Sequence, residues 1–209
     1  MRKTKEEAEV TREKLLDAGL KVFSRKGYAT ATLDDIAKEA GVTRGAVYWH
    51  FKGGKADLMV AILNDGLMRV NDIMLEVIAA EEKPINKLER LAVRMLEFLE
   101  EDEKYRALQE ILIFKTGEDP DLTLRLADKQ LAQRETLKNL AAMIDDAKAA
   151  GEVRKDVDTT TIALAYYGMI NGIVLLWMVD RSVSEHPQFS IKDRAEPITK
   201  LFIESIATQ

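Results

Sequence analysis

The 209-residue sequence contains no cysteine, four prolines and two histidines, and only 6% of its residues are aromatic. The absence of cysteine excludes a disulfide framework, a thiolate metal site and a cysteine nucleophile. The few prolines and the scarcity of alternating β-branched residues leave almost no segment with the pattern of a strand. The histidines, His50 and His186, lie in different regions, and neither has a glutamate three residues before it, as in di-iron bundles. We therefore expect an all-α protein.

The sequence also lacks the short motifs of common enzymes. It contains no G-x-S-x-G, no P-loop and no G-x-G-x-x-G, the motifs of α/β-hydrolases, nucleotide hydrolases and dinucleotide-binding domains. Acidic pairs such as Asp145 and Asp146 have no convergent partner nearby in the sequence, so a solvated helix face explains them more simply than a metal site. We expect no catalytic residue, no cofactor and no metal.

Negative charge dominates the chain as a whole but not its amino-terminal part. The formal net charge is −5, whereas residues 1–60 carry 12 basic and 9 acidic side chains. This distribution indicates that a polyanion, if bound, is held at one end only. The opening residues lack the apolar core of a signal peptide, so we expect a cytoplasmic protein.

Residues 159–179 contain no charged side chain and are almost long enough to span a bilayer. Against a membrane span stand the mid-segment Asn171, two glycines and the flanking acids Asp158 and Asp180. The alternative is a helix buried by its own domain and by a partner subunit, and we expect no membrane association.

Residues 15–51 have the order of a helix-turn-helix. Apolar residues recur with helical spacing from residue 15 to residue 23. Thr32 and Asp35 form a T-x-x-D capping box that begins a short second helix, which Gly41 ends. Thr43 then caps a third helix. A helix, a short helix, a tight turn and a helix are the elements of that DNA-binding motif.

The third helix, in "GVTRGAVYWHF", turns its large aromatic residues away from the core. At about 100° per residue, Val47 and Phe51 share the inward face. Tyr48 and Trp49 fall on the outside, where folding gives no reason for large aromatics. Either this is a solvated amphipathic helix with a chance aromatic pair, or its outer face reads DNA. The candidate DNA-contacting residues are Thr32, Thr43, Arg44, Gly45, Tyr48, Trp49, His50, Lys52 and Lys55.

The segment "ATLDDIAKEAGVTRGAVYWHFKGGKADL" closely resembles the DNA-binding signature of the tetracycline-repressor (TetR) family, "TTLxxIAxxAGVTRGAxYWHFKxK". Weaker matches at residues 1–23, 105–118 and 166–178 resemble the AcrR-like multidrug-efflux regulators of that family. The stretch "KGGKADL" is one residue longer than the family's usual "KDKEDL". The family's phosphate contact therefore falls either to Lys55 or to backbone N–H groups near Gly53 and Gly54.

The resemblance implies an amino-terminal DNA-binding domain, residues 1–54, and a helical effector-binding and dimerisation domain, residues 55–209. Periodicity predicts further helices at residues 55–81, 85–101, 103–116, 120–149, 158–180 and 192–207. The family's apolar drug pocket maps to Leu88, Leu91, Met95, Gln109, Ile113, Thr136, Leu140, Tyr167 and Ile170, although plain core packing is the simpler reading of such stripes. Its two-fold four-helix interface maps to Gly168, Gly172, Leu176, Trp177, Leu201 and Phe202.

Three hypotheses for function follow. The favoured one is a dimeric repressor that binds a palindromic double-stranded operator, is released by a small apolar or amphipathic effector, and controls a multidrug efflux pump. The second is a helical small-molecule-binding or scaffold protein without operator binding. The third is a helical-bundle enzyme, which would require a bound metal or cofactor.

Overall fold

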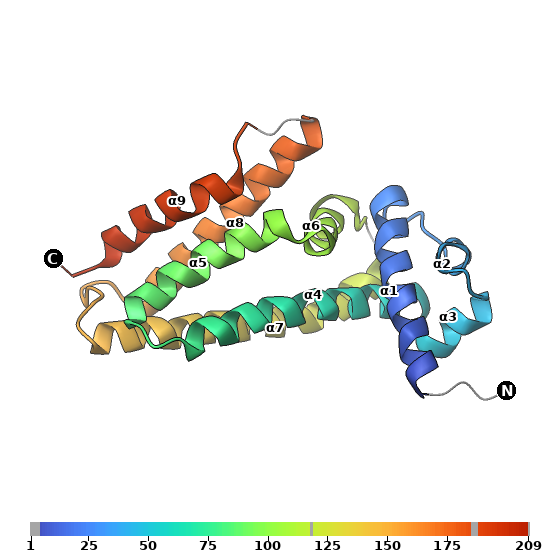
Figure 1. Cartoon of the computed structure of the whole chain (residues 1–209), viewed down its shortest axis with the longest axis horizontal. Coiled ribbons are helices and arrows are strands. Elements are labelled where there is room, and N and C mark those ends of the chain that lie inside the picture. Colours follow the sequence, from blue (N-terminus) through green and yellow to red (C-terminus); the bar gives the residue numbers. More distant parts are fainter. Residues whose placement is uncertain (1–4, 118, 185–187, 209) are drawn as a thin grey trace. The chain divides into compact units, whose positions relative to one another are not determined.

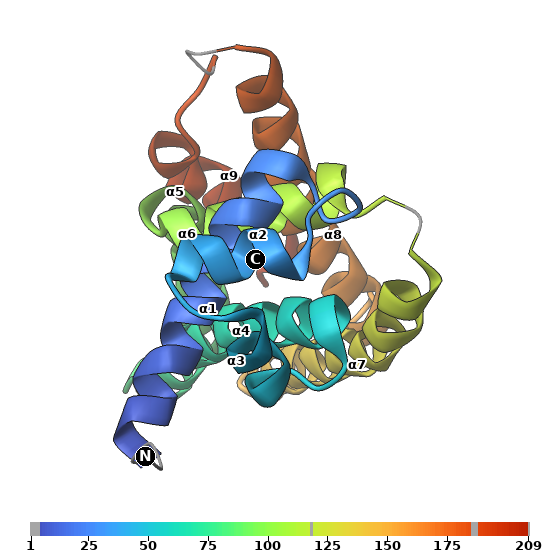
Figure 2. The same cartoon turned by 90° about the vertical axis from the view of Figure 1, so that its right-hand side faces the viewer.

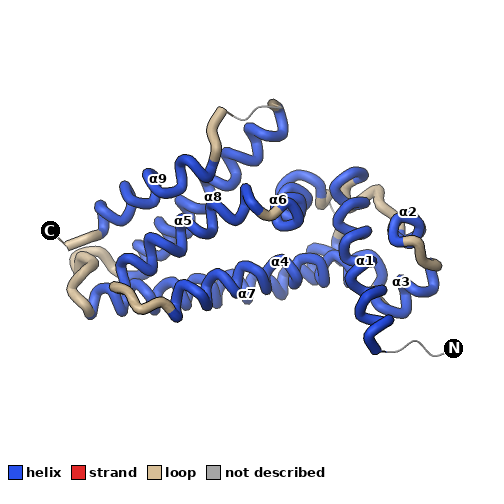
Figure 3. The backbone as a smooth tube through the Cα atoms, in the orientation of Figure 1, coloured by secondary structure: helices blue, strands red, loops and turns tan. Residues whose placement is uncertain are grey.

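The structure, a computed structural model, describes residues 5–117, 119–184 and 188–208. Within these ranges the chain is helical, with one isolated β-bridge between Val153 and Ala207 and no strand (Figure 3). The α-helices, labelled in Figure 1, are α1 (Lys5–Lys26), α2 (Leu33–Ala40), α3 (Arg44–His50), α4 (Gly54–Ala79), α5 (Pro84–Glu101), α6 (Glu103–Glu110), α7 (Pro120–Ala149), α8 (Thr159–Val183) and α9 (Ile191–Ile206). A short π-helical segment, η1 (Ile111–Lys115), follows α6.

The all-α prediction is confirmed, and the observed helix ends lie within three residues of the predicted ones. One difference is internal. The single helix predicted over residues 103–116 is an α-helix only to Glu110 and continues as the π-helical segment η1. Hydrophobic periodicity does not distinguish these two windings over a segment of only five residues.

The chain forms two compact units, which are described separately. Unit 1 comprises residues 1–68 and 104–129, and unit 2 comprises residues 69–103 and 130–209. Unit 1 holds the helix-turn-helix, α6, η1 and the first part of α4. The helices α5, α8 and α9 belong to unit 2. The division at residue 54 stays a prediction.

The core of unit 1 explains why α1, α2 and α3 pack together. α2 lies against α1 and is followed by α3 through a short turn (Figures 1 and 2). Each helix contributes fully buried apolar side chains, among them Phe23 of α1, Ile36 of α2 and Val47 of α3. Leu58 and Met59 of α4 join the same cluster, so the short helices are held by burial rather than by intrinsic helix propensity.

Local signals fix the ends of the two short helices as predicted. The Thr32 side chain accepts from the Asp35 N–H, and the Asp35 carboxylate accepts from the Thr32 N–H, which completes the capping box. Gly41 ends α2 with a φ of 67°, in the left-handed region. Thr43 accepts a hydrogen bond from the Ala46 N–H at the start of α3.

Replacing Gly41 by alanine is expected to destabilise the protein by about 1–2 kcal/mol, because a side chain disfavours left-handed φ by that amount. An added Cβ would meet no heavy atom within 4 Å, so the cost is that of the backbone alone. Denaturant unfolding followed by circular dichroism measures it.

Gly45→Ala is the matched control. Gly45 lies inside α3, and its added Cβ would meet only the Thr43 hydroxyl, at 3.8 Å. Alanine there is expected to raise stability by up to ~1 kcal/mol. Equal unfolding midpoints for the two variants would contradict the role assigned to the Gly41 turn.

The core of unit 2 forms where α5 packs along α9 and α8 contacts both (Figure 1). Leu88, Ala92 and Ile144 are fully buried there. The Tyr166 hydroxyl donates a hydrogen bond to the Leu88 carbonyl at 2.7 Å, which ties α8 to α5. Burial raises the pKa of Tyr166, so the phenol stays protonated and remains a donor at neutral pH.

The helix α8 is long and apolar enough to cross a membrane by length and composition, which a core helix of a soluble protein also satisfies. Its two faces differ. Ile162, Ala163 and Tyr166 are buried in unit 2, whereas other apolar side chains of the helix are exposed. The large exposed apolar residues of α8 are Leu164, Leu175, Leu176, Val179 and Val183.

Candidate nucleic-acid interface

The third helix of the helix-turn-helix presents its aromatic residues to solvent as predicted. Val47 and Phe51 are buried and anchor α3. Tyr48 and Trp49 are among the exposed large side chains, and Trp49 is 66% exposed. A tryptophan with that much free surface adds little to the core, so this face is available to another molecule.

Arg44 lies on this exposed face with its guanidinium held by two neighbours. Its Nη1 atom is 3.2 Å from the Asp34 carboxylate and its Nη2 atom donates to the Tyr48 hydroxyl at 3.4 Å. The guanidinium carbon also lies 5.6 Å from the centroid of the Tyr48 ring. The hydrogen bond to Tyr48 and the charge of Asp34 raise the pKa of Arg44, which is therefore always cationic.

Lys55 has partners inside the chain. Its ammonium donates to the carbonyls of Tyr28 at 2.8 Å and Ala29 at 3.2 Å, and lies 4.4 Å from the Tyr28 ring centroid. The alternative donors are engaged as well, since the Gly53 N–H donates to the Asp57 carboxylate. A phosphate contact at either place stays a prediction; at Gly53 it requires the bond to Asp57 to break, whereas the Lys55 ammonium has a third N–H donor.

The remaining candidates lie as follows. Trp49 packs edge-on against the His50 ring, with centroids 4.5 Å apart. Lys52 is exposed just after α3, and Thr43 and Gly45 are exposed at its start. The structure thus brings together Thr43, Arg44, Gly45, Tyr48 and Trp49 along one short segment. Their contacts with DNA stay predictions.

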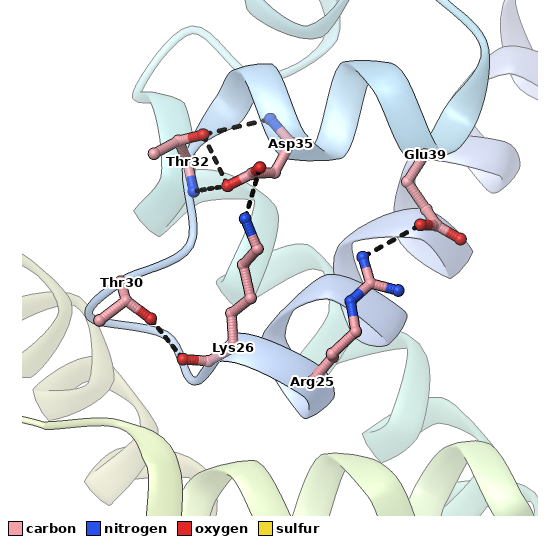
Figure 4. A network of polar contacts seen from close by, with 6 residues as sticks. All are labelled: Arg25, Lys26, Thr30, Thr32, Asp35 and Glu39. Atoms are coloured by element: carbon pink, nitrogen blue, oxygen red, sulfur yellow. Dashed lines mark hydrogen bonds and ion pairs between the residues drawn. The ribbon is translucent and has the colours of Figure 1, made fainter.

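Thr32 is held in a polar network that joins α1 to α2 (Figure 4). Lys26 Nζ lies 2.6 Å from Asp35 Oδ1, and the Thr32 hydroxyl donates to Asp35 Oδ2 at 2.8 Å. Beside it, Arg25 pairs with Glu39 at 3.2 Å. These bonds fix the entry of α2, and with it the turn that positions α3.

The carboxyl group of Asp35 has a pKa of about 2, lowered from 3.8 by the hydrogen bond from Lys26 and then by those from Thr32. A group whose pKa is lower in the folded state stabilises the fold above its unfolded-state pKa and loses that contribution as the pH falls towards the folded value. The stabilisation by Asp35 is therefore expected to be complete above about pH 4 and lost by about pH 2.

Comparing wild type with Asp35→Asn by denaturant unfolding at successive pH values tests this. The stability difference between them should shrink as the pH falls from about 4 to about 2. Asp156, whose pKa is also lowered to about 2 by Arg154, is present in both proteins, so its contribution to stability cancels in the difference. A difference that stays constant over this window would contradict the assignment.

The predicted effector residues are only partly brought together. Leu88, Leu91 and Leu140 are buried in one apolar cluster of unit 2, and Met95, Tyr167 and Ile170 pack against it. Gln109 and Ile113 belong to unit 1. Thr136 is exposed on α7. The pocket assignment stays a prediction, because core packing accounts for the buried leucines equally well.

The predicted dimer residues on α8 and α9 differ in exposure. Leu176 is 66% and Leu201 72% exposed, and a Cβ added at Gly168 or Gly172 would meet no atom within 4 Å. Phe202 is partly buried, with its ring against Tyr166. These residues leave an open apolar face on α8 and α9.

Trp177 requires a correction. Its side chain is 1% exposed within a single chain, so it leaves no surface for a partner. At 100° per residue it points about 100° away from Leu176. The same rule places Val179 and Val183 within the arc of about 80° from Gly168 to Leu176, and Leu175 and Leu164 within about 40° of its edge. Sequence reasoning missed these four exposed residues, although their spacing was available.

Comparison with known proteins gives matches to both halves of the chain. The family model of bacterial regulatory proteins of the tetR family matches residues 15–62, and that of the C-terminal region of MAATS-type transcriptional repressors matches residues 83–207. The HTH-type transcriptional regulator AcrR of Shigella flexneri is 32% identical over 209 aligned residues, which cover 97% of this chain and 92% of the relative.

Solved structures share the fold. NalD, the secondary repressor of the MexAB-OprM multidrug efflux pump in Pseudomonas aeruginosa, has a TM-score of 0.83 at 24% identity and covers 98% of this chain and 100% of its own. SmeT, the repressor of the Stenotrophomonas maltophilia multidrug efflux pump SmeDEF, has been solved in complex with triclosan. That complex has a TM-score of 0.78 at 25% identity and covers 96% of this chain and 93% of its own.

Proposed function

Because the chain belongs to the TetR family of bacterial transcriptional regulators, we propose that it is a dimeric repressor released from a palindromic operator by a small apolar or amphipathic effector. The observation that carries this proposal is the exposed face of α3, where Arg44, Tyr48 and Trp49 project from a helix anchored by Val47 and Phe51. The proposed site of action is the cytoplasm, where the operator lies.

Base reading is assigned to the exposed face of α3. Arg44 has the planar fork that donates two hydrogen bonds to the O6 and N7 atoms of guanine in the major groove. Tyr48 and Thr43 are placed to contact bases or phosphates, and Lys52 supplies a charge for the backbone. Gly45 has no side chain, which allows α3 to approach the groove closely.

Dimerisation is assigned to the open face of α8 and α9. The exposed Leu176 and Leu201 provide apolar surface, and Gly168 and Gly172 allow a second helix to come close. A two-fold interface repeats each contact, so two copies of α3 would face successive major grooves. The operator is then expected to be palindromic, with half-sites about one helical turn apart or a multiple of it.

Effector binding is assigned to the apolar cluster of unit 2. The structural neighbours NalD and SmeT repress multidrug efflux pumps, and SmeT has been solved in complex with triclosan, so a pump operon is the proposed target. Tyr167, which packs against this cluster, is the polar candidate for orienting a ligand. An effector weakens operator binding only if it binds the conformation that does not fit DNA more tightly than the conformation that does. A hundredfold difference between these two affinities corresponds to about 2.7 kcal/mol.

The proposal is tested by titrating the purified protein onto the DNA fragment upstream of its own gene and onto a scrambled duplex of the same length. A tight, salt-sensitive shift is expected only with the upstream fragment. Adding triclosan to the complex then tests release. Equal binding to both duplexes would disprove the repressor, whereas unchanged binding in triclosan would reject that effector class alone.

A further inference from the structure

Asp34 lies beside the arginine assigned to base reading. It follows Thr32 and Leu33 at the start of α2, and its carboxylate lies 3.2 Å from Nη1 of Arg44 at the start of α3. Both side chains are exposed, at 64% and 58% respectively. The ten-residue separation in sequence is bridged by the turn at Gly41, so the contact depends on the helix-turn-helix geometry itself.

Helix capping does not account for this contact. Asp35, the next residue, already completes the capping box with Thr32 and binds Lys26 (Figure 4). An acidic residue in the first turn also favours the helix dipole, but that role requires no partner on α3. Asp34 is therefore free to act on Arg44.

The carboxylate affects the two kinds of DNA contact differently. A phosphate is an anion, so it is repelled by Asp34 and is attracted only weakly by an arginine already neutralised by that residue. A guanine edge is uncharged and accepts both arms of the guanidinium fork. Asp34 thus penalises a phosphate contact by Arg44 more than a base contact.

The magnitudes allow the correct base to displace Asp34. Breaking an exposed ion pair lowers affinity by at most about fivefold. A good bidentate base contact discriminates by about 5- to 150-fold. In a complex with the wrong sequence, no base edge offers this gain, and Arg44 stays on Asp34.

On the basis of the proposed function, we propose that Asp34 determines specificity by keeping Arg44 off phosphates until a matching base edge accepts it. A further prerequisite is that the pair forms before DNA arrives. The Tyr48 contacts favour this, because the hydroxyl at 3.4 Å and the ring at 5.6 Å hold the same guanidinium from the other side. These contacts hold the Arg44 side chain in one position, which makes it less available to other anions.

The test compares wild type with Asp34→Asn on the upstream fragment and on a scrambled duplex, by fluorescence anisotropy over a series of salt concentrations. With the scrambled duplex, the released Arg44 should neutralise one more phosphate per protomer. The slope of log affinity against log salt should steepen by about 0.9 per protomer, so affinity should rise, and the rise should be largest at low salt. With the upstream fragment the slope should stay unchanged.

Three variants sharpen the result. Asp17→Asn removes the same charge and releases Lys104 from an exposed ion pair of 2.6 Å between α1 and α6, and it should leave both slopes unchanged. Asp34→Glu, which keeps the carboxylate, should restore wild-type behaviour. In an Arg44→Ala background, Asp34→Asn should no longer steepen the slope. Thermal unfolding of each variant verifies that the fold is retained.

The inference is overturned if Asp34→Asn leaves the scrambled-duplex slope unchanged, if Asp17→Asn steepens it equally, or if the effect persists without Arg44. In each of these cases wild type still prefers the upstream fragment, and the repressor proposal stands. If wild type shows no such preference, the proposed function fails first and the inference falls with it.

Discussion

Leu176→Glu is expected to dissociate the proposed dimer, raising its dissociation constant by about 1000-fold. In a two-fold interface each substitution occurs twice, and each buried carboxylate without a partner costs about 2 kcal/mol or more. Leu176 is 66% exposed in the single chain, so the fold of the protomer should be unaffected. Sedimentation velocity over a range of protein concentrations measures the change.

The matched control is Leu75→Glu. Leu75 is an exposed leucine on α4, outside the α8 and α9 face, and it receives the same new charge. We expect it to leave the sedimentation coefficient unchanged. The Leu176 variant should also bind the operator more weakly, because the two copies of α3 are no longer joined in one dimer. Dimers of normal stability in the Leu176 variant would place the interface elsewhere.

Arg44→Ala is expected to lower operator affinity by about 5- to 150-fold per half-site, because it removes a bidentate base contact. Arg44→Lys keeps the charge but loses the planar fork. It should therefore retain wild-type affinity for a scrambled duplex while losing most of the preference for the operator. Anisotropy titrations on both duplexes provide the two affinities.

Arg154→Ala serves as the control for charge. Arg154 is an exposed arginine of unit 2 paired with Asp156, and its removal changes the net charge by the same amount. Operator affinity should be nearly unchanged in this variant. If Arg44→Lys binds the operator as wild type does, Arg44 acts as a phosphate contact, and base reading must be assigned to other residues.

The sequence identified the elements whose causes are local. The Thr32–Asp35 capping box spans four residues, and the turn at Gly41 needs only a residue that tolerates positive φ. The inward face of α3 followed from helical spacing, because Val47 and Phe51 are one turn apart. Such signals involve neighbouring residues, so they could be predicted before any tertiary structure was known.

Sequence reasoning was less successful where one pattern fits several orientations. The residues of α8 are uncharged over most of its length, so hydrophobicity alone did not distinguish the core side from the open side. Trp177 was therefore placed at the dimer seam, although it is buried in its own protomer, and the exposed Leu164 and Val179 were missed. The angle around the helix axis, counted at about 100° per residue from Gly168, separates the buried Trp177 from the exposed Leu164 and Val179.

By itself, the sequence determined the all-α class, the helix ends and the segment that carries the proposed DNA-reading face. Only the tertiary structure decided which charged groups already have partners. Lys55 binds carbonyls near Tyr28, 27 residues away, and Arg44 meets Asp34 across a turn. Caps and helical phase depend on residues within one or two turns, whereas these pairings depend on how separate helices pack, which no local pattern encodes.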